Sequence, residues 1–204
     1  MSVLISVAME EESLLLYQAL TGRKRLVLSQ CERFKCAGKW CYLLTTGVGK
    51  VNAAVNVTKY LYRYQSIDTV INIGFAAATK DLELGKVYKA DIISQWDFNI
   101  SDNIARHDRF NLHTGGNIHL TSGDSFVTKN NIKQVHIMEP YARMFDMEAY
   151  AVAKASAGFP VDLYVMKVVS DYPEDNDDGS SFKNYLAEAR YNLFESVLSL
   201  IESL

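Results

Sequence analysis

Three short runs of apolar and β-branched residues constrain the fold of this chain most. They are SVLISVA (2–8), TVINIGF (69–75) and LYVMKVVS (163–170). Nearly continuous apolar runs of this length, without strict alternation, are typical of strands that are covered on both faces of a sheet. Segments with helical spacing lie between them, at 10–20, 51–64 and 148–157, and an amphipathic helix is expected from Phe182 to Leu204.

The remaining segments add further strands. We expect them at Arg25–Ala37, Trp40–Thr46, Gly85–Gln95, Ile118–Thr121 and Arg143–Met147, with a loop from His107 to Asn117. Strands that alternate with helices predict an α/β protein, here a three-layer α/β/α sandwich around a central mixed sheet. Because no repeat or linker-like stretch interrupts the 204 residues, we expect a single domain over 1–204.

Composition excludes several classes of protein. Hydrophobic residues make up 49% of the chain and the formal net charge is only −3, which is unlike a disordered chain. The 21 Lys and Arg residues are outnumbered by 24 acidic residues and form no basic block, so we expect no nucleic-acid partner. No apolar stretch is long enough to span a membrane.

Two features predict a cytoplasmic protein. The apolar start of the chain lacks a basic flank and runs directly into Glu10, Glu11 and Glu12, unlike a secretory signal. The three cysteines at 31, 36 and 41 form no C-x-x-C pair, so neither a disulfide framework nor a zinc site is indicated. We interpret them as reduced, half-buried strand residues.

No metal site is predicted either. His107, His113 and His119 recur every six residues, which matches no metal-binding spacing, so we interpret them as surface histidines of a loop. The acidic run 174–178 (EDNDD) lacks the closing glutamate of a calcium loop.

Carboxylates follow three of the expected strands. Glu10–Glu12 follow the first, Asp146 and Glu148 lie at the end of the strand at 143–147, and Asp171 follows the last. Ligands of open α/β folds bind at the carboxyl ends of the strands, so one acid could serve there as general base and another as general acid. The same acids would also suit helix N-termini, and the pattern alone leaves both interpretations open.

Six segments carry a resemblance to a known family. They are AMEEE (8–12), TGVGKVNAA (46–54), INIG (71–74), SGDSF (122–126), DMEA (146–149) and VVSD (168–171). In this order and at these intervals they resemble the nucleoside phosphorylase/nucleosidase superfamily, and specifically the bacterial 5′-methylthioadenosine/S-adenosylhomocysteine nucleosidases. The resemblance runs over nearly the whole chain and implies a nucleoside phosphorylase-like fold.

The resemblance implies hydrolysis of the N-glycosidic bond of a 5′-thio-substituted adenine nucleoside, a reaction of methionine salvage, without metal or organic cofactor. Glu12 would be the general base for the attacking water, and Asp171, next to Ser170, would protonate N7 of adenine. Glu148 would bind the ribose hydroxyls. The remaining substrate contacts would come from Phe126, the backbone of Val127, Met147, Ser170 and Phe182. A homodimer is also implied, and the apolar faces of the 51–64 helix are compatible with it.

These roles suit the chemistry. A carboxylate stabilises the oxocarbenium-like transition state, while a protonated acid neutralises the departing base. Asp171 can act this way only if it is protonated when substrate is bound, which requires a desolvated site that raises its pKa.

Water is the expected nucleophile. Phosphorylases of the superfamily carry a glycine-rich, arginine-containing phosphate loop after the first strand, and this chain has Glu10–Glu12 there, which would repel phosphate. The TGVGK segment (46–50) lacks the spacing of a Walker A phosphate loop and is interpreted as a strand-to-helix turn.

Three departures from the family pattern keep other functions open. Phe75 and three alanines follow INIG where the family has a small polar residue and glycines, Lys167 replaces a common arginine, and the region 99–117 is short. The alternatives are a nucleosidase for another purine nucleoside such as futalosine, a nucleoside phosphorylase, and a catalytically silent nucleoside-binding relative.

Overall fold

The computed structural model describes residues 1–23, 30–98, 109–175 and 186–204. Its strands are β1 (Ser2–Val7), β2 (Cys31–Cys36), β3 (Lys39–Thr45), β4 (Thr69–Ala78), β5 (Val87–Gln95), β6 (Phe110–Asn111), β7 (Ile118–Ser122), β8 (Met144–Asp146) and β9 (Asp162–Asp171). Its helices are α1 (Glu10–Thr21), α2 (Lys50–Arg63), α3 (Ile132–Met138), α4 (Ala149–Ser156) and α5 (Leu186–Ser203), with a 3-10 turn η1 (Pro173–Asp175).

The described strands form one mixed sheet in the order β2-β3-β1-β4-β8-β7-β5-β6. Strand β9 lies off this path, because it pairs in parallel with β4 and antiparallel with β5. Since β4 also pairs with β8, β8 with β7 and β7 with β5, these five strands close a ring. The carboxyl ends of the parallel strands β1, β4 and β9 therefore meet at the same side of the sheet.

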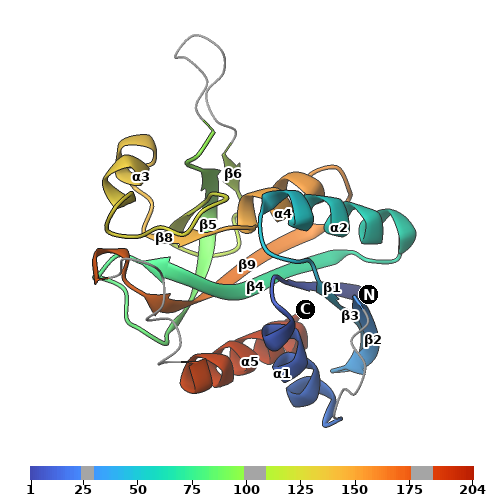
Figure 1. Ribbon diagram of the computed structural model, residues 1–204. Helices are drawn as coiled ribbons and strands as arrows, with labels where there is room; N and C mark the ends of the chain where they lie inside the picture. Colours follow the sequence, from blue (N-terminus) through green and yellow to red (C-terminus); the bar gives the residue numbers. More distant parts are fainter. Residues whose placement is uncertain (24–29, 99–108, 176–185) are drawn as a thin grey trace.

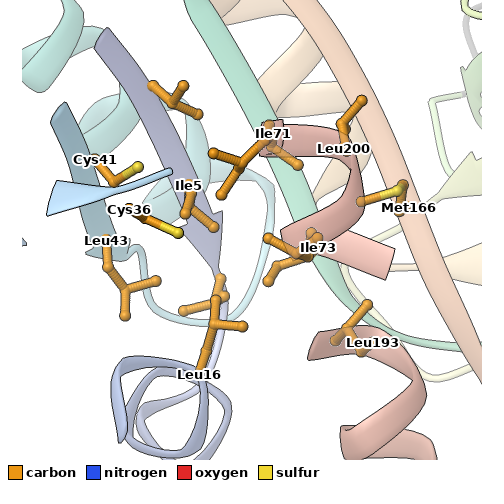
Figure 2. Packing of buried hydrophobic residues seen from close by; sticks show 14 of the residues in the cluster. Ile5, Leu16, Cys36, Cys41, Leu43, Ile71, Ile73, Met166, Leu193 and Leu200 are labelled. Atoms are coloured by element: carbon orange, nitrogen blue, oxygen red, sulfur yellow. The ribbon is translucent and has the colours of Figure 1, made fainter. Parts of the chain in front are cut away.

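Helices cover both faces of the sheet, as predicted (Figure 1). Alternate residues of β1 point to opposite layers: Val3, Ile5 and Val7 pack toward α1 and α5, whereas Leu4 packs toward α2 and α4. Figure 2 shows the first of these layers, in which Leu16 of α1 and Leu193 and Leu200 of α5 pack with strand residues. Both layers bury large aliphatic side chains, so the hydrophobic effect stabilises each face.

The predicted three-layer α/β/α fold is thus confirmed, and its three apolar runs are β1, β4 and β9. Among the described helices, none has the length and apolarity needed to cross a lipid bilayer. The N-terminal part of the strand expected at 25–37 and the beginning of the helix expected at 182–204 lie outside the described residues, as do residues 99–108.

Three details differ from the sequence-based expectations. Strand β4 continues past Phe75 to Ala78, because its last residues pair with β8 and β9. Strand β6 interrupts the loop expected at 107–117, and α3 had not been expected. Helix α3 has only 7 residues, so it spans too few turns for a periodic apolar pattern to stand out.

The interpretation of His119 as a surface residue is wrong. His119 is buried in β7, where its Nε2 lies 2.8 Å from Ser94 Oγ and 3.6 Å from the buried Glu139 carboxylate. Burial, with Arg109 nearby, lowers the pKa of His119 to about 4, so the ring is neutral at pH 7. His113 is exposed as expected, and His107 lies outside the described residues.

Candidate active site

The acidic strand ends meet at one cavity. Glu12 after β1, Asp146 and Glu148 around the end of β8, and Asp171 at the end of β9 all line it. Of the residues predicted from the sequence, those that line the cavity are Glu12, Phe126, Val127, Met147, Glu148, Ser170 and Asp171. Phe182 lies outside the described residues.

Glu12 is held by the start of α1. It is the third residue of the helix, and its side chain turns back so that Oε2 accepts the Met9 N–H at 2.9 Å. This bond satisfies one of the free N–H groups at a helix N-terminus. The other oxygen, Oε1, accepts the Phe75 N–H at 3.2 Å. Burial raises the pKa of Glu12 above its ordinary value, although both N–H groups and the charge of Lys167 oppose this effect.

A bulge brings Ser170 and Asp171 to the same cavity. Adjacent strand residues normally point to opposite faces, but the β4–β9 register shifts here, so that Val169 pairs with Ala76 and Asp171 with Ala77. Ser170 is the extra residue, and such irregularities re-aim side chains at the edges of active sites. The Ser170 hydroxyl donates to Asp171 Oδ1 at 2.6 Å, which orients that carboxyl group.

Glu148 is tied to the first turn of α2. Its Oε1 accepts the Gly49 N–H at 2.9 Å, and Asp124 Oδ1 accepts the next N–H, that of Lys50, at 2.7 Å. The N-terminus of α2, part of the TGVGK segment, therefore binds carboxylates of the protein itself. Burial, with Asp146 beside it, raises the pKa of Glu148 to about 7.

Asp146 and Lys167 form an ion pair that the sequence analysis did not assign to the site. Lys167 is only 2% exposed, and its Nζ lies 2.9 Å from Asp146 Oδ2. Asp146 also accepts bonds from the Ser122 hydroxyl and the Ala149 N–H. The sequence does contain a signal for this ion pair. A lysine within the apolar run LYVMKVVS needs a carboxylate partner if the strand is buried.

Apolar side chains form the rest of the lining. Val127 is buried, whereas Phe126 is 66% exposed at the cavity's edge, where its ring is accessible to a bound molecule. Phe75 also lines the cavity while packing against the core cluster shared by α1 and α5, so it borders the site without being sequestered in the core. A second, mainly apolar cavity between α1 and α5 shares Glu12 and Phe75 with the first.

This arrangement suits acid–base chemistry on a ligand that is partly apolar. The cavity combines buried carboxylates with aromatic and aliphatic walls, as sites for small molecules do. Across the described parts of the chain, no group of three or more His, Cys, Asp or Glu side chains is arranged to hold a metal ion.

Comparisons with known proteins extend over the full length of the chain. No protein-family model matches it. The 5′-methylthioadenosine/S-adenosylhomocysteine nucleosidase of Lysinibacillus sphaericus is 28% identical, with 100% of both chains covered. The nucleosidase of the same description from Geobacillus kaustophilus is 27% identical, over 98% of this chain and 97% of the relative.

Solved structures agree with these relatives. The structure of 5′-methylthioadenosine/S-adenosylhomocysteine nucleosidase from Neisseria meningitidis, in complex with methylthio-immucillin-A, matches 100% of this chain and 99% of its own with a TM-score of 0.84 and 25% identity. The likeness thus covers the sheet, both helical layers and the chain segments that surround the cavity. Throughout this sequence the chain is therefore similar to the 5′-methylthioadenosine/S-adenosylhomocysteine nucleosidases, the family that its six motifs resemble.

Proposed function

We propose that the protein is a purine nucleosidase that hydrolyses the N-glycosidic bond of 5′-methylthioadenosine and S-adenosylhomocysteine, releasing adenine and a thioribose. The observation that carries this proposal is the convergence of Glu12, Glu148 and Asp171 on one partly apolar cavity. The full-length relatives with this activity in their names support the same reaction. Such a reaction belongs to methionine salvage.

The three carboxyl groups take different roles. Glu12 removes a proton from the attacking water, and its buried carboxylate faces the developing positive charge of the ribosyl group. Asp171 donates a proton to N7 of adenine, so that the base leaves neutral. Glu148 accepts hydrogen bonds from the ribose hydroxyls, with Met147 beneath the sugar.

The base is held by the other side of the cavity. Phe126 stacks on the purine, and the backbone of Val127 reads its hydrogen-bonding edge. Ser170 keeps Asp171 oriented through the 2.6 Å hydrogen bond. Phe182, which lies outside the described residues, is a further substrate contact in this proposal, as the resemblance implies.

Water, rather than phosphate, is the nucleophile. In the described structure the Gly49 and Lys50 N–H groups at the start of α2 already donate to Glu148 and Asp124. A phosphate at this helix would have to displace carboxylates and would lie among further acids of the cavity, at a Coulomb cost.

We also propose a cytoplasmic homodimer. The outer face of α2 carries exposed apolar residues, Val51 at 71%, Val55 at 60% and Tyr62 at 75% exposure, at helical spacing. Val48, which lines the cavity, precedes them, so a partner on this stripe would border the site. Cys36 and Cys41 are buried, rather than half-buried as expected, and form no disulfide, which suits a reducing compartment. Burial also raises the pKa of Cys41 to about 12.

The first test measures adenine or hypoxanthine release from methylthioadenosine, S-adenosylhomocysteine, adenosine, inosine and futalosine, each with and without phosphate. We expect release from the two thioethers at rates that phosphate does not change. Phosphate-dependent formation of a sugar 1-phosphate would instead identify a phosphorylase. Preferential release of the base from futalosine would identify a nucleosidase for another nucleoside. Inactivity on every substrate would identify a catalytically silent relative.

Conservative variants test the acid and the base. We expect Glu12→Gln to lower kcat by about 10²–10⁴-fold with little change in substrate affinity, because general base catalysis contributes on this scale. Asp171→Asn should also lower kcat. Loss of binding together with activity in Glu12→Gln would indicate a structural role, and normal turnover in Asp171→Asn would remove the general acid assignment.

The raised pKa of Glu148 predicts how binding depends on pH. Ribose hydroxyls donate to the ionised carboxylate, and with a pKa of about 7 this form becomes dominant as the pH rises from 6 to 8. The affinity of Glu12→Gln for methylthioadenosine should therefore increase about tenfold over this range, measured by calorimetry. The same measurement on Glu12→Gln/Glu148→Gln should lose this increase. An equal pH dependence in both variants would contradict the role of Glu148.

Substitutions that introduce negative charge among the exposed apolar residues of α2 test whether the protein is a dimer. Val51→Glu/Val55→Glu should sediment as a monomer where the wild type sediments as a dimer, because burying two carboxylates across an interface is costly. Ile137→Glu, which alters an equally exposed apolar residue on α3, is the matched control and should leave the dimer intact. A wild-type protein that is monomeric at micromolar concentration would refute the dimer.

A further inference from the structure

Lys167 is unusual because it is a lysine buried inside the sheet next to the reacting groups. Among the described residues that line the cavity, it is the one Lys or Arg. Its position on β9 pairs with Gly74 of β4, and its ammonium reaches Asp146 at 2.9 Å. Burying an ammonium is costly unless carboxylates compensate for lost hydration, so its place here calls for an explanation.

Gly74 lets Lys167 and Glu12 approach each other. A methyl group added at Gly74 would lie 2.9 Å from Glu12 Oε1 and 3.6 Å from Lys167 Nζ. These two atoms are therefore no more than 6.5 Å apart, the sum of the two distances. The φ of Gly74 is +148°, so a side chain here would be both crowded and strained.

The charges around the ammonium are unbalanced. The titratable groups that face Lys167 come from several elements: Glu12 of α1, Asp146 of β8, Glu148 before α4, Asp171 of β9 and, in register on β5, Tyr88. The Tyr88 hydroxyl accepts the Glu83 N–H at 3.1 Å and is engaged there. Among the described residues, one cation thus serves several carboxylates, and Asp146 is the one that forms an ion pair with it.

We propose that Lys167, anchored by Asp146, is a positioning residue of the reaction, whose charge keeps the Glu12 carboxylate ionised so that it can take a proton from the attacking water. This inference rests on the proposed nucleosidase function. The Asp146 bond fixes the ammonium, and Ser122 and Ala149 fix Asp146 in turn, so the cation cannot swing away from Glu12 when the ligand enters. Lys167 acts through Glu12 and does not itself exchange a proton with the substrate.

The directions of the pKa shifts of Glu12 and Lys167 agree with this role. Burial raises the pKa of Glu12, and the positive charge of Lys167 opposes this rise. Burial acts to lower the pKa of Lys167, but Asp146, Glu148 and Glu12 outweigh it, and its pKa lies above the ordinary value. Lys167 therefore stays protonated over the pH range in which the enzyme is active.

The test separates the charge of Lys167 from its contribution to folding. Lys167→Met would leave Asp146 as an unpaired buried charge, so the main variant is Asp146→Asn/Lys167→Met, in which the Asn oxygen can still accept the Ala149 N–H while the Asn amide donates to the Ser122 hydroxyl. Lys167→Arg preserves the charge, and Lys86→Met removes a lysine from the exposed Lys86–Glu83 pair as a matched control.

The readout is the acid limb of the pH profile, that is, the rise of kcat with increasing pH. In the enzyme–substrate complex the ribose hydroxyls already engage Glu148, so this limb reports the ionisation of Glu12. We expect Asp146→Asn/Lys167→Met to move this limb up by about one pH unit, so that kcat at pH 6 falls about tenfold relative to its plateau. Lys167→Arg and Lys86→Met should keep the wild-type limb. A uniformly lower kcat with an unmoved limb would overturn the proposal.

A second measurement keeps the inference distinct from the proposed function. The titration of Glu12 can be followed by ¹³C NMR of glutamate-labelled protein, with Glu12→Gln to assign the signal. An upward shift of this titration in Asp146→Asn/Lys167→Met would support the charge effect, and an unchanged titration would overturn it. A wild-type protein that releases no adenine, despite the shift, would refute the nucleosidase function and with it any role of Lys167 in that reaction.

Discussion

The structure of the site depends on how several carboxylates are buried beside a single lysine. A desolvated carboxylate is stable only when hydrogen bonds or an opposite charge replace its water. Here backbone N–H groups and Lys167 share this task. Glu12 accepts the N–H groups of Met9 and Phe75, and Glu148 accepts that of Gly49. The charge of Lys167 also favours the ionised form of both, and Lys167 pairs directly with Asp146. The backbone groups come from the starts of α1 and α2 and from β4, so the sheet and both helical layers must be in place before the acids can be buried together.

Much of the fold could be predicted from the sequence, because its strongest signals are local. The runs at 2–8, 69–75 and 163–170 specify buried strands by hydrophobicity alone. The acids after β1 and at the end of β9 reach one edge of the sheet because both strands run parallel to β4, whereas β8 is antiparallel to β4 and brings its acids there by pairing with the last residues of β4. The short helix α3 and the extension of β4 to Ala78 could not be predicted, since the first has too few turns and the second depends on pairing with distant strands.

The same contrast holds within the site. The carboxylates at positions 12, 148 and 171 could be singled out by their places after strands and by family resemblance. The pairing of Asp146 with Lys167, and the bulge that turns both Ser170 and Asp171 toward the cavity, depend on the register between strands far apart in the chain. His119 illustrates the converse: its spacing from the other histidines was uninformative, whereas its place in a strand determined its burial.

Because β4, β8, β7, β5 and β9 form a closed ring, the residues of the site that lie on these strands are held more rigidly than those that lie on helices. Gly74, Asp146, Lys167 and Asp171 all belong to strands of this ring, so pairing with a neighbouring strand constrains the position of each of them. Glu12 and Gly49 belong instead to the first turns of helices packed outside the ring. We expect a ligand of different shape to be accommodated by small movements of these helices, while Asp171 and Lys167 keep their spacing. Selectivity for the distal part of a substrate could thus change during evolution without disturbing the framework that supports bond cleavage.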